Sequence, residues 1–481
     1  MSDEPPLLEL RNLKKYFEES NNIIDTLRGN EPSQIQAVDD VSFTLEENES
    51  MAVIGESGCG KTTLLLTLIG LHDISDGDIY YKGEPLSEFS KADWKRYRRN
   101  VQVIFQDPFN SLDPKMTVRD SMLEPLKIHG IGTREEREEQ IREVLRDVEL
   151  HPPEKYLNQK PMNMSGGEKQ RVSIGRGLVL DPDIILADEP VSMLDVSTQA
   201  AVLNMMKDLI DDYGVSMIYI SHDLSTVSYI SEMVNVMYLG RIVESAPTER
   251  ILQDPKHPYS EALVSAIPIP DPTHDRERTQ MFGAPRDPKD LGEGCRFRDR
   301  CPAVIAPEEI SIDQDAYREV IAFREKLERD ELSLDRIRES LDDEDPDPEA
   351  FSTAIRRNYF THDIDGENEV VIEDSLEALV AGDRRTAIET LRSRFESVCE
   401  ITPKYVENDE NWNVACHHYY DHEEVKANVK QINEPHDGGH RDPENRTNTT
   451  AVTTDRRGDA PARHRSCRAH DQTGVIEPCR R

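Results

Sequence analysis

A glycine-rich segment between two apolar runs constrains this chain more than any other feature. The segment 55–62 reads GESGCGKT and fits the pattern G-x-x-x-x-G-K-[ST]. It follows the apolar run 51–54, which is typical of a buried strand, and it opens the run 63–71, which is typical of a helix. A strand, a tight loop and a helix in this order aim backbone N–H groups at an anion. The sequence therefore predicts a phosphate-binding site within an α/β fold.

The positions of this loop have distinct predicted roles. Lys61 is expected to reach the β- and γ-phosphates of a nucleotide, and the Thr62 hydroxyl is expected to bind Mg²⁺. The glycines let the backbone N–H groups converge on the phosphate oxygens. The residues expected to contact the nucleotide here are Gly55, Ser57, Gly58, Gly60, Lys61, Thr62 and Thr63.

A second motif supplies carboxylates. The run 184–187 is apolar and ends in Asp188 and Glu189. After a phosphate-binding loop, Asp188 is expected to hold Mg²⁺ and Glu189 to polarise the attacking water.

Strand-like and helix-like runs alternate over residues 1–268, which predicts an α/β domain with a largely parallel sheet. The strand-like runs are 51–55, 101–105, 183–188 and 216–220.

Further motifs stand in a fixed order between and around these two. The segment 164–171 reads MSGGEKQR, segment 192–195 reads SMLD, Gln106 lies in VIFQDPFNSLDP, and His222 follows the run SMIYIS. Together with the phosphate loop they resemble the motifs of ABC ATPases, the nucleotide-binding subunits of ATP-driven transporters. The chain departs from the commonest forms of two motifs, which are LSGGQ and SALD, without losing a catalytic group.

The resemblance narrows to one subfamily. Segments 105–118, 257–272, 294–303 and 412–420 are similar to those of the oligopeptide/dipeptide importer ATPases. The fold that this implies is an ABC-type nucleotide-binding domain with a helical subdomain and a cysteine-bearing C-terminal extension. The importer subfamily implies a paralogous ABC ATPase subunit, two membrane permeases and an extracellular substrate-binding protein as partners. It places the chain at the cytoplasmic face of the membrane, as a peripheral protein.

The family also implies roles for single residues. Two nucleotide-binding domains meet head to tail, and each ATP lies between Lys61 of one and Ser165, Gly166 and Gly167 of the other. Gln106 is expected to contact Mg²⁺ and the attacking water, and His222 to contact the γ-phosphate. Tyr16, in LKKYF, resembles the aromatic residue that stacks on adenine.

The seven cysteines are unevenly placed. Cys59 lies in the phosphate loop, and Cys467 and Cys479 lie near the end of the sequence. The remaining four, Cys295, Cys301, Cys399 and Cys416, are enough for a [4Fe–4S] cluster or a structural Zn²⁺. The subfamily favours the cluster, with zinc or no metal as alternatives. His417 and His418 adjoin the last cysteine and are candidate substitute ligands.

Composition changes along the chain predict its organisation. Residues 1–268 form the nucleotide-binding domain, and 269–305 with 399–425 form the cysteine-bearing extension. Residues 306–398 are strongly charged with helical apolar spacing and predict an acidic helical insert, with an acidic linker as the alternative. Residues 426–481 have few apolar side chains and predict disorder.

The net charge of −37 limits the classes of partner and setting. Such a field repels phosphate backbones, so no nucleic-acid partner is expected. The acidic, lysine-poor composition favours a halophilic, archaeal source.

Neither a secretory signal nor a membrane-spanning run is found in the sequence. Peptides are the expected cargo, with sugars or nickel chelates as alternatives, and a soluble ABC ATPase outside transport is the remote alternative.

Overall fold

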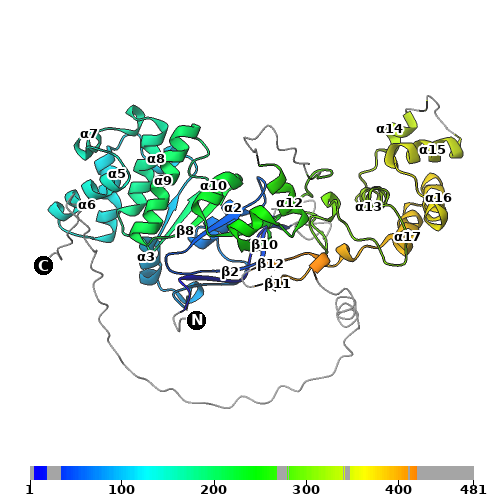
Figure 1. The fold of residues 1–481 in the computed structure, drawn as a ribbon, viewed down its shortest axis with the longest axis horizontal. Helices are drawn as coiled ribbons and strands as arrows, with labels where there is room; N and C mark the ends of the chain where they lie inside the picture. The colour runs from blue at the N-terminus through cyan, green and yellow to red at the C-terminus, as the bar shows by residue number, and fades with distance from the viewer. Residues whose placement is uncertain are drawn as a thin grey trace, which may run out of the picture. The chain divides into compact units, whose positions relative to one another are not determined.

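The computed structural model describes residues 5–18, 34–267, 279, 281–339, 341, 347–409 and 412–419 (Figure 1). The chain divides into two units, Met1–Val425 and Lys426–Arg481, and the described residues all belong to the first. The predicted disordered tail, 426–481, and its two cysteines lie outside the described residues.

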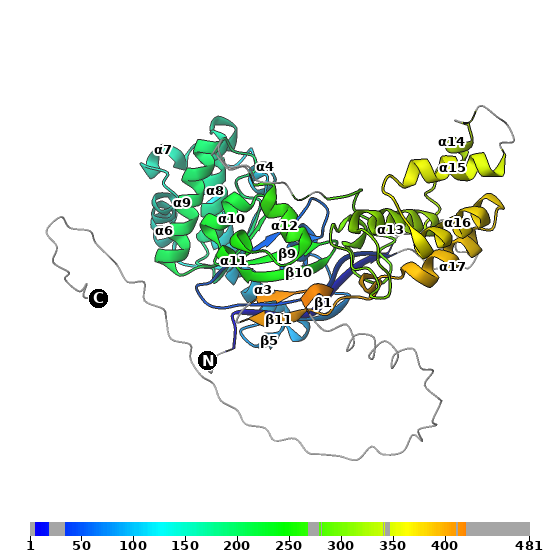
Figure 2. The same ribbon diagram turned by 45° about the vertical axis from the view of Figure 1, so that its right-hand side comes forward.

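An eight-stranded sheet forms the centre of the nucleotide-binding part, in the order β11-β12-β10-β9-β3-β8-β7-β6. The five strands from β9 to β6 pair in parallel, and β10, β12 and β11 add antiparallel pairs at one edge. Figure 2 shows β9 and β10 side by side. The alternating strand and helix runs of the sequence are thus confirmed as an α/β fold. The strands are β3 Ser50–Ile54, β6 Val101–Ile104, β7 Ile184–Asp188, β8 Ser216–Ser221, β9 Met233–Tyr238, β10 Arg241–Pro247, β11 Val406–Asp409 and β12 Trp412–Val414.

A smaller antiparallel sheet has the order β2-β1-β4-β5. Its strands are β1 Leu8–Glu18, β2 Gln34–Leu45, β4 Asp76–Tyr81 and β5 Glu84–Pro85. The pairing of β1 with β2 shifts register at several points between Leu10 and Tyr16. These shifts break the simple alternation of inward and outward side chains along β1.

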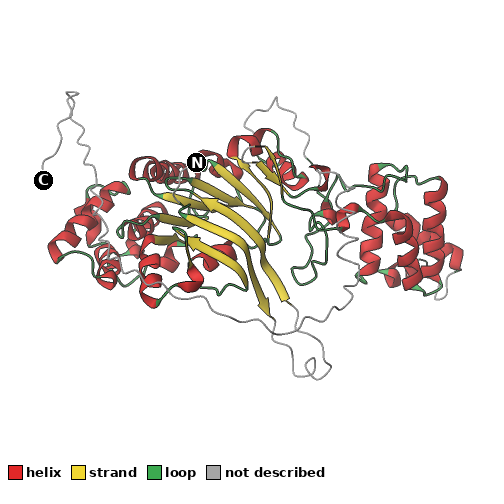
Figure 3. Ribbon diagram, turned by 90° about the horizontal axis from the view of Figure 1, so that it is seen from below, coloured by secondary structure: helices red, strands yellow, loops and turns green. Residues whose placement is uncertain are grey.

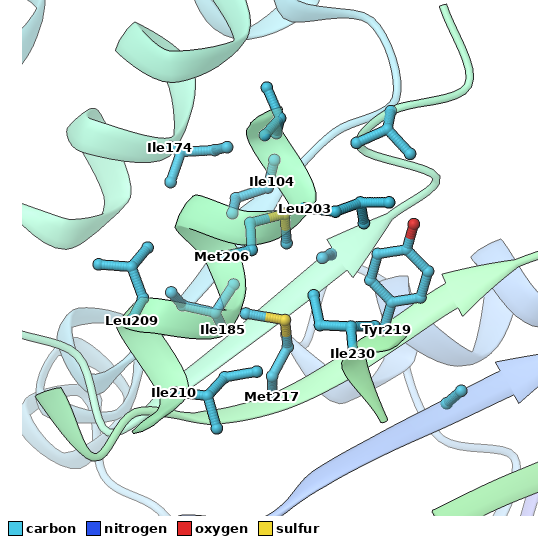
Figure 4. Close-up of a cluster of buried hydrophobic side chains, with 14 of the residues drawn as sticks. Ile104, Ile174, Ile185, Leu203, Met206, Leu209, Ile210, Met217, Tyr219 and Ile230 are labelled. Atoms are coloured by element: carbon cyan, nitrogen blue, oxygen red, sulfur yellow. The ribbon is translucent and has the colours of Figure 1, made fainter. Parts of the chain in front are cut away.

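The central strands β3, β7 and β8 are buried along their whole length because both faces of the large sheet are covered. Ile184 and Leu186 of β7 lie in one core with the leucines of helix α2 (Lys61–Leu68) and with the small sheet. Ile185, between them, points to the opposite core, where α9 (Val196–Tyr213) contributes Met206 and Leu209 (Figure 4). The continuous apolar run that predicted a strand therefore serves two cores at once.

The remaining helices of this part cover the sheet or form the helical subdomain. Threonine caps begin α5 and α6, and Ser165 begins α8, each in a reciprocal capping box with an acidic residue three positions later. The helices are α3 Lys91–Asn100, α4 Pro108–Ser111, α5 Val118–His129, α6 Arg134–Asp147, α7 Pro153–Leu157, α8 Gly166–Leu178, α10 Leu224–Ile230, α11 Thr248–Gln253 and α12 Pro258–Ser265.

A group of helices with its own core follows (Figure 3). They are α13 Gln314–Glu328, α14 Leu334–Glu339, α15 Pro348–Tyr359, α16 Gly366–Val380 and α17 Arg384–Phe395. Buried Tyr317, Ile355 and Leu391 belong to this core, which is separate from the two cores of the sheets. The division of the chain at 306 and 398 stays a prediction.

The two ends of this helical segment lie side by side. The Ser397 hydroxyl donates a hydrogen bond of 2.6 Å to the Ile305 carbonyl oxygen. The Cys295 N–H likewise donates to the Cys399 carbonyl oxygen at 2.8 Å. The helices α13–α17 thus leave and rejoin the rest of the chain at one place.

Within the described residues, none of the helices combines the length and the apolar character needed to span a bilayer.

The separate core of α13–α17 makes a prediction about stability. Leu391 is fully buried in it, so Leu391→Ala should lower the free energy of unfolding by about 2–5 kcal/mol in urea titrations. The control is Arg385→Ala in the same helix, because the exposed Arg385 side chain pairs only with Glu389 at the surface and should change that free energy by about 0.5 kcal/mol or less. Equal effects of the two variants would contradict a packed core.

Candidate nucleotide-binding site

The predicted motifs meet because their strands run in parallel. Ile54 at the end of β3 pairs with Ser221 at the end of β8, and Ile220 pairs with Asp188 at the end of β7. The segments that follow these strands therefore emerge at one edge of the sheet. They line a hollow of about 800 Å³. Its walls include residues 55–63, Gln106, Asp188, Glu189 and His222.

The glycines of the phosphate loop are required by close backbone contacts. A Cβ on Gly55 would lie 2.1 Å from the Met237 carbonyl oxygen, and one on Gly60 would lie 2.0 Å from that of Ala37. Gly60 also has φ = +110° and stands at the start of α2, where no side chain caps the helix. The N–H groups of the first turn are thus left for an anion.

Lys61 is buried within this loop. Its ammonium donates hydrogen bonds of 2.7 and 2.9 Å to the carbonyl oxygens of Gly55 and Glu56. The loop therefore folds around the cation that is expected to meet the β- and γ-phosphates.

Thr62 and Asp188 lie together at the same edge. The Thr62 hydroxyl donates to the Asp188 carboxylate at 3.1 Å, and burial raises the pKa of Asp188. A divalent cation would compensate for the buried negative charge. Mg²⁺ is commonly held by one or two protein oxygens and completed by phosphate and water, which fits a hydroxyl and a carboxylate beside a phosphate loop.

Glu189 lies at the centre of the predicted catalytic group. One carboxylate oxygen accepts from the Gln106 amide at 3.0 Å, and the other is 2.8 Å from His222 Nδ1. The Glu189 backbone has φ = +44°, a left-handed conformation that costs a residue other than glycine free energy and is frequent at functional sites. Gln106 and His222, from two separate loops, thus converge on one carboxylate that lines the hollow.

The signature segment is positioned differently. Ser165 caps helix α8, and the Glu168 carboxylate accepts from the Ser165 N–H at 2.9 Å. Ser165 and Gly166 are exposed, Gly167 is buried against Thr198, and none of Ser165, Gly166 and Gly167 is among the residues that line the hollow. The acidic residue in MSGGE thus preserves the helix cap.

The structure does not place the predicted aromatic residue, Tyr16, in the wall of the hollow. Phe17 lines the hollow, whereas the Tyr16 hydroxyl donates a hydrogen bond to Asp39. Successive residues of a strand point to opposite faces, so both rings cannot face the same space. The register shifts in β1 hid this alternation in the sequence.

Other wall residues carry no motif that would have revealed them. They are Ile35, Gln36, Ala37, Leu239, Gly240, Leu263 and Pro288. Pro288 shows that the segment after α12 also reaches the hollow. Long-range packing alone brings these residues in.

The four cysteines expected at a metal site come from three segments that bond to one another. The Cys295–Cys399 backbone hydrogen bond joins two of them, and the third is joined by His418 Nε2, which donates to the Ala303 carbonyl oxygen at 2.7 Å. Burial, and then the nearby Cys399 thiol, raise the pKa of Cys295 to about 12. Cys416 is held at about the same pKa by burial, with Cys399 again contributing.

No set of metal ligands is found among the described side chains of this cysteine site. In the part of the chain that the structure describes, no three Cys, His, Asp or Glu side chains are grouped closely enough to hold a metal ion. The two candidate substitute ligands instead bond to backbone carbonyl oxygens through Nε2: His417 to Ile401 at 2.8 Å, and His418 to Ala303.

Three family models match separate parts of the chain. Residues 38–192 match the ABC transporter family, and residues 243–306 match the C-terminal region of oligopeptide/dipeptide transporters. Residues 314–411, which include the helices α13–α17, match a domain of unknown function, DUF8228.

Relatives that match 63% of this chain carry transport names. The oligopeptide transport ATP-binding protein AppF of Bacillus subtilis is 40% identical over 304 residues, which cover 63% of this chain and 91% of AppF. The dipeptide transport ATP-binding protein DppF of Haemophilus influenzae is 41% identical over 301 residues, which cover 63% of this chain and 90% of DppF. A solved ATP-binding cassette dimer with ADP and Pi covers 50% of this chain and 98% of its own, at 26% identity and a TM-score of 0.44.

The position of Phe17 makes a prediction about nucleotide affinity. Phe17→Leu removes the aromatic ring from the wall of the hollow and should raise the dissociation constant of Mg²⁺-ATP by about 5-fold or more, because stacking on a base is worth about 1–3 kcal/mol. The matched variant Tyr16→Leu should change it by about twofold or less. Competition against a fluorescent ATP analogue measures both dissociation constants. A larger effect of Tyr16→Leu would support Tyr16, instead of Phe17, as the residue that stacks on adenine.

Proposed function

Because this chain belongs to the family of ATP-binding subunits of ABC transporters, we propose that it hydrolyses ATP to power the import of di- and oligopeptides. The ATPase activity follows from membership of the family. The peptide cargo is supported by the match of residues 243–306 and by the names of the relatives.

The single observation that carries the proposal is the placing of Glu189. Its carboxylate lies between Gln106 and His222, in the hollow that Lys61 and the phosphate loop also line. In this arrangement Glu189 orients and polarises the water that attacks the γ-phosphate. His222 would contact the γ-phosphate, and Gln106 would contact both the attacking water and Mg²⁺.

The other binding residues follow from the same geometry. Lys61 exchanges its two backbone carbonyl partners for phosphate oxygens when ATP binds. Thr62 and Asp188 would hold Mg²⁺, and the ion would supply positive charge to the phosphates. The backbone N–H groups at the start of α2 receive the β-phosphate.

A second nucleotide-binding subunit completes the site. Ser165 and Gly166 are exposed and lie outside the hollow of their own chain, so they are available to the ATP of a facing subunit. Following the family, we take that subunit to be a paralogous ATPase. Closure of the pair on ATP and its opening after hydrolysis provide the two states that move a transporter.

A second hollow, of about 750 Å³, is the proposed docking place for a permease. It lies between the end of α2, helix α3 and the end of α5, with Trp94 and the largely exposed Ile128 in its walls. Lys91, Lys95 and Arg98 surround it in a chain whose net charge is strongly negative. A short permease helix with apolar and acidic side chains fits this surface. The chain then acts at the cytoplasmic face of the membrane, with a substrate-binding protein outside.

The cysteine site is proposed to hold a [4Fe–4S] cluster, with zinc as the alternative. Four thiols, three of them buried, are a suitable donor set for either, although the described side chains are not arranged as ligands. Cys295, Cys301, Cys399 and Cys416 would be the ligands. Bonds from the metal to the cysteine sulfurs would link segments that are far apart in sequence.

Metal analysis tests this part separately. Anaerobically purified protein should contain about four irons per chain and show the absorbance of a [4Fe–4S] cluster. Cys399→Ser should lower the iron content, and Cys59→Ser, in the phosphate loop, should leave it unchanged. About one zinc per chain would identify the alternative, and the absence of both metals would contradict a metal centre.

Glu189→Gln tests the catalytic proposal. The change retains the shape of the side chain but removes its charge, so ATP should still bind while hydrolysis falls by about 10²-fold or more. The matched control is Glu249→Gln, an exposed glutamate of α11 outside the hollow, which should hydrolyse ATP at the normal rate. Undiminished hydrolysis in Glu189→Gln would contradict the assigned role.

Uptake in cells carrying Glu189→Gln, in the salt of the host, tests the cargo. Uptake of labelled di- and oligopeptides should collapse while that of a labelled sugar survives. Loss of sugar or nickel-chelate uptake instead would assign a different cargo to the same ATPase. If none of these substrates is affected, the import proposal is wrong and a soluble ABC ATPase becomes the better interpretation.

A further inference from the structure

The short segment between Cys295 and Cys301 contacts the nucleotide site directly. It reads CRFRDRC, so one arginine follows the first cysteine and another precedes the second. Both Arg296 and Arg300 are buried, although arginine is usually exposed. Their partners include Glu56 of the phosphate loop and two other residues that line the hollow, Gln36 and Leu239.

Arg296 holds the wall near Phe17. Its guanidinium donates to the Gln36 side-chain oxygen at 2.6 Å, and also to the Leu239 carbonyl oxygen and the Asp39 carboxylate. Gln36 and Leu239 themselves line the hollow. Asp39 in turn accepts a hydrogen bond from the Tyr16 hydroxyl.

Arg300 holds the phosphate loop. Its two terminal nitrogens donate to the two carboxylate oxygens of Glu56 at 2.8 and 3.0 Å, a bidentate pair. The Glu56 N–H donates to the Tyr259 hydroxyl at 2.8 Å, and the Glu56 carbonyl oxygen accepts from Lys61. Glu56 is therefore fixed on three sides, one of them the segment that carries the cysteines.

The segment is itself stiff and firmly held at its other side. The backbone N–H groups of Arg298, Arg300 and Cys301 all donate within the segment, which forms a 3₁₀ turn at 298–300. The Arg298 side chain donates to buried Glu325 of α13 at 2.7 Å. A displacement of either cysteine therefore moves Arg296 or Arg300 with it.

We propose that Arg296 and Arg300 are positioning residues that couple the cysteine site to the nucleotide hollow, so that binding at one site changes binding at the other. The coupling rests on the proposed function only in taking ATP as the ligand of the hollow. It holds whether the cysteines bind a metal or remain thiols, because the arginines transmit the position of the segment. Thermodynamic linkage makes the effect reciprocal. ATP changes the affinity of the cysteine site for its ligand by the same factor by which that ligand changes the affinity of the hollow for ATP.

Thiol labelling of the full-length protein tests the coupling. The protein carries Glu189→Gln so that ATP persists, and monobromobimane is added with and without Mg²⁺-ATP. Mass spectrometry follows each cysteine separately, which keeps Cys59 of the phosphate loop apart from Cys295 and Cys301. We expect ATP to slow the labelling of Cys295 and Cys301 by about 5-fold or more, the usual lower range of coupling between sites.

Variants of Arg300 separate coupling from general stability. Arg300→Met should abolish the protection and raise the dissociation constant of ATP, while Arg300→Lys should retain part of both. Arg356→Met is the control, because Arg356 forms a 2.8 Å ion pair with Glu369 and neither residue lines the hollow. If Arg300→Met fails to fold, Glu56→Gln breaks the same pair from the other side and should likewise abolish the protection.

The outcomes distinguish this proposal from the function it rests on. If ATP does not bind to the Glu189→Gln protein, the proposed function fails. If ATP binds but does not change the labelling of Cys295 and Cys301, the coupling is wrong and the function stands. The same holds if ATP slows the labelling in Arg300→Met and Glu56→Gln as much as in the protein that retains both residues.

Discussion

The parallel pairing of β3, β8, β7 and β6 is the constraint on which the rest of the structure depends. Because these strands run the same way, the segments that follow them emerge at one edge, and a cation, two carboxylates, an amide and an imidazole meet there. The strands can be adjacent only if both of their faces are covered, which the two cores accomplish. The chemistry of the site is thus a consequence of strand register, and each of its residues depends on pairings made far away in the sequence.

The second level of organisation is a chain of buried arginines. Arg300 and Arg296 join the cysteine-bearing segment to the nucleotide hollow, and Arg324 of α13 donates to the Phe395 carbonyl oxygen and to Glu400, next to Cys399. Removing one partner of such a buried pair leaves an uncompensated charge, so these contacts specify the arrangement more than they add to stability. The helices α13–α17 are therefore bound to the segments that carry the cysteines, as well as to one another.

Local patterns in the sequence were sufficient for the parallel core and for most of its edge. The phosphate loop, Asp188, Glu189 and His222 each follow a recognisable strand, and the structure brings them together. Phe17 was missed because register shifts in β1 obscure which side chains share a face. No pattern in the sequence predicts the Arg300–Glu56 pair, because it joins residues 244 positions apart and depends on folding of the whole unit. The domain boundaries and the halophilic source stay predictions, because composition reflects the solvent as much as the fold.

The adjacent ends of the helical segment bear on how such a chain can change through its history. Ile305 and Ser397 are hydrogen-bonded, so a short link between them would close the chain with little distortion of either side. The entropy of closing a loop grows only slowly with its length, so a long excursion between two neighbouring points costs little more than a short one. The position of its two ends is therefore compatible with gain or loss of the whole segment in one genetic event, without a change in the order of the strands in the nucleotide-binding sheet.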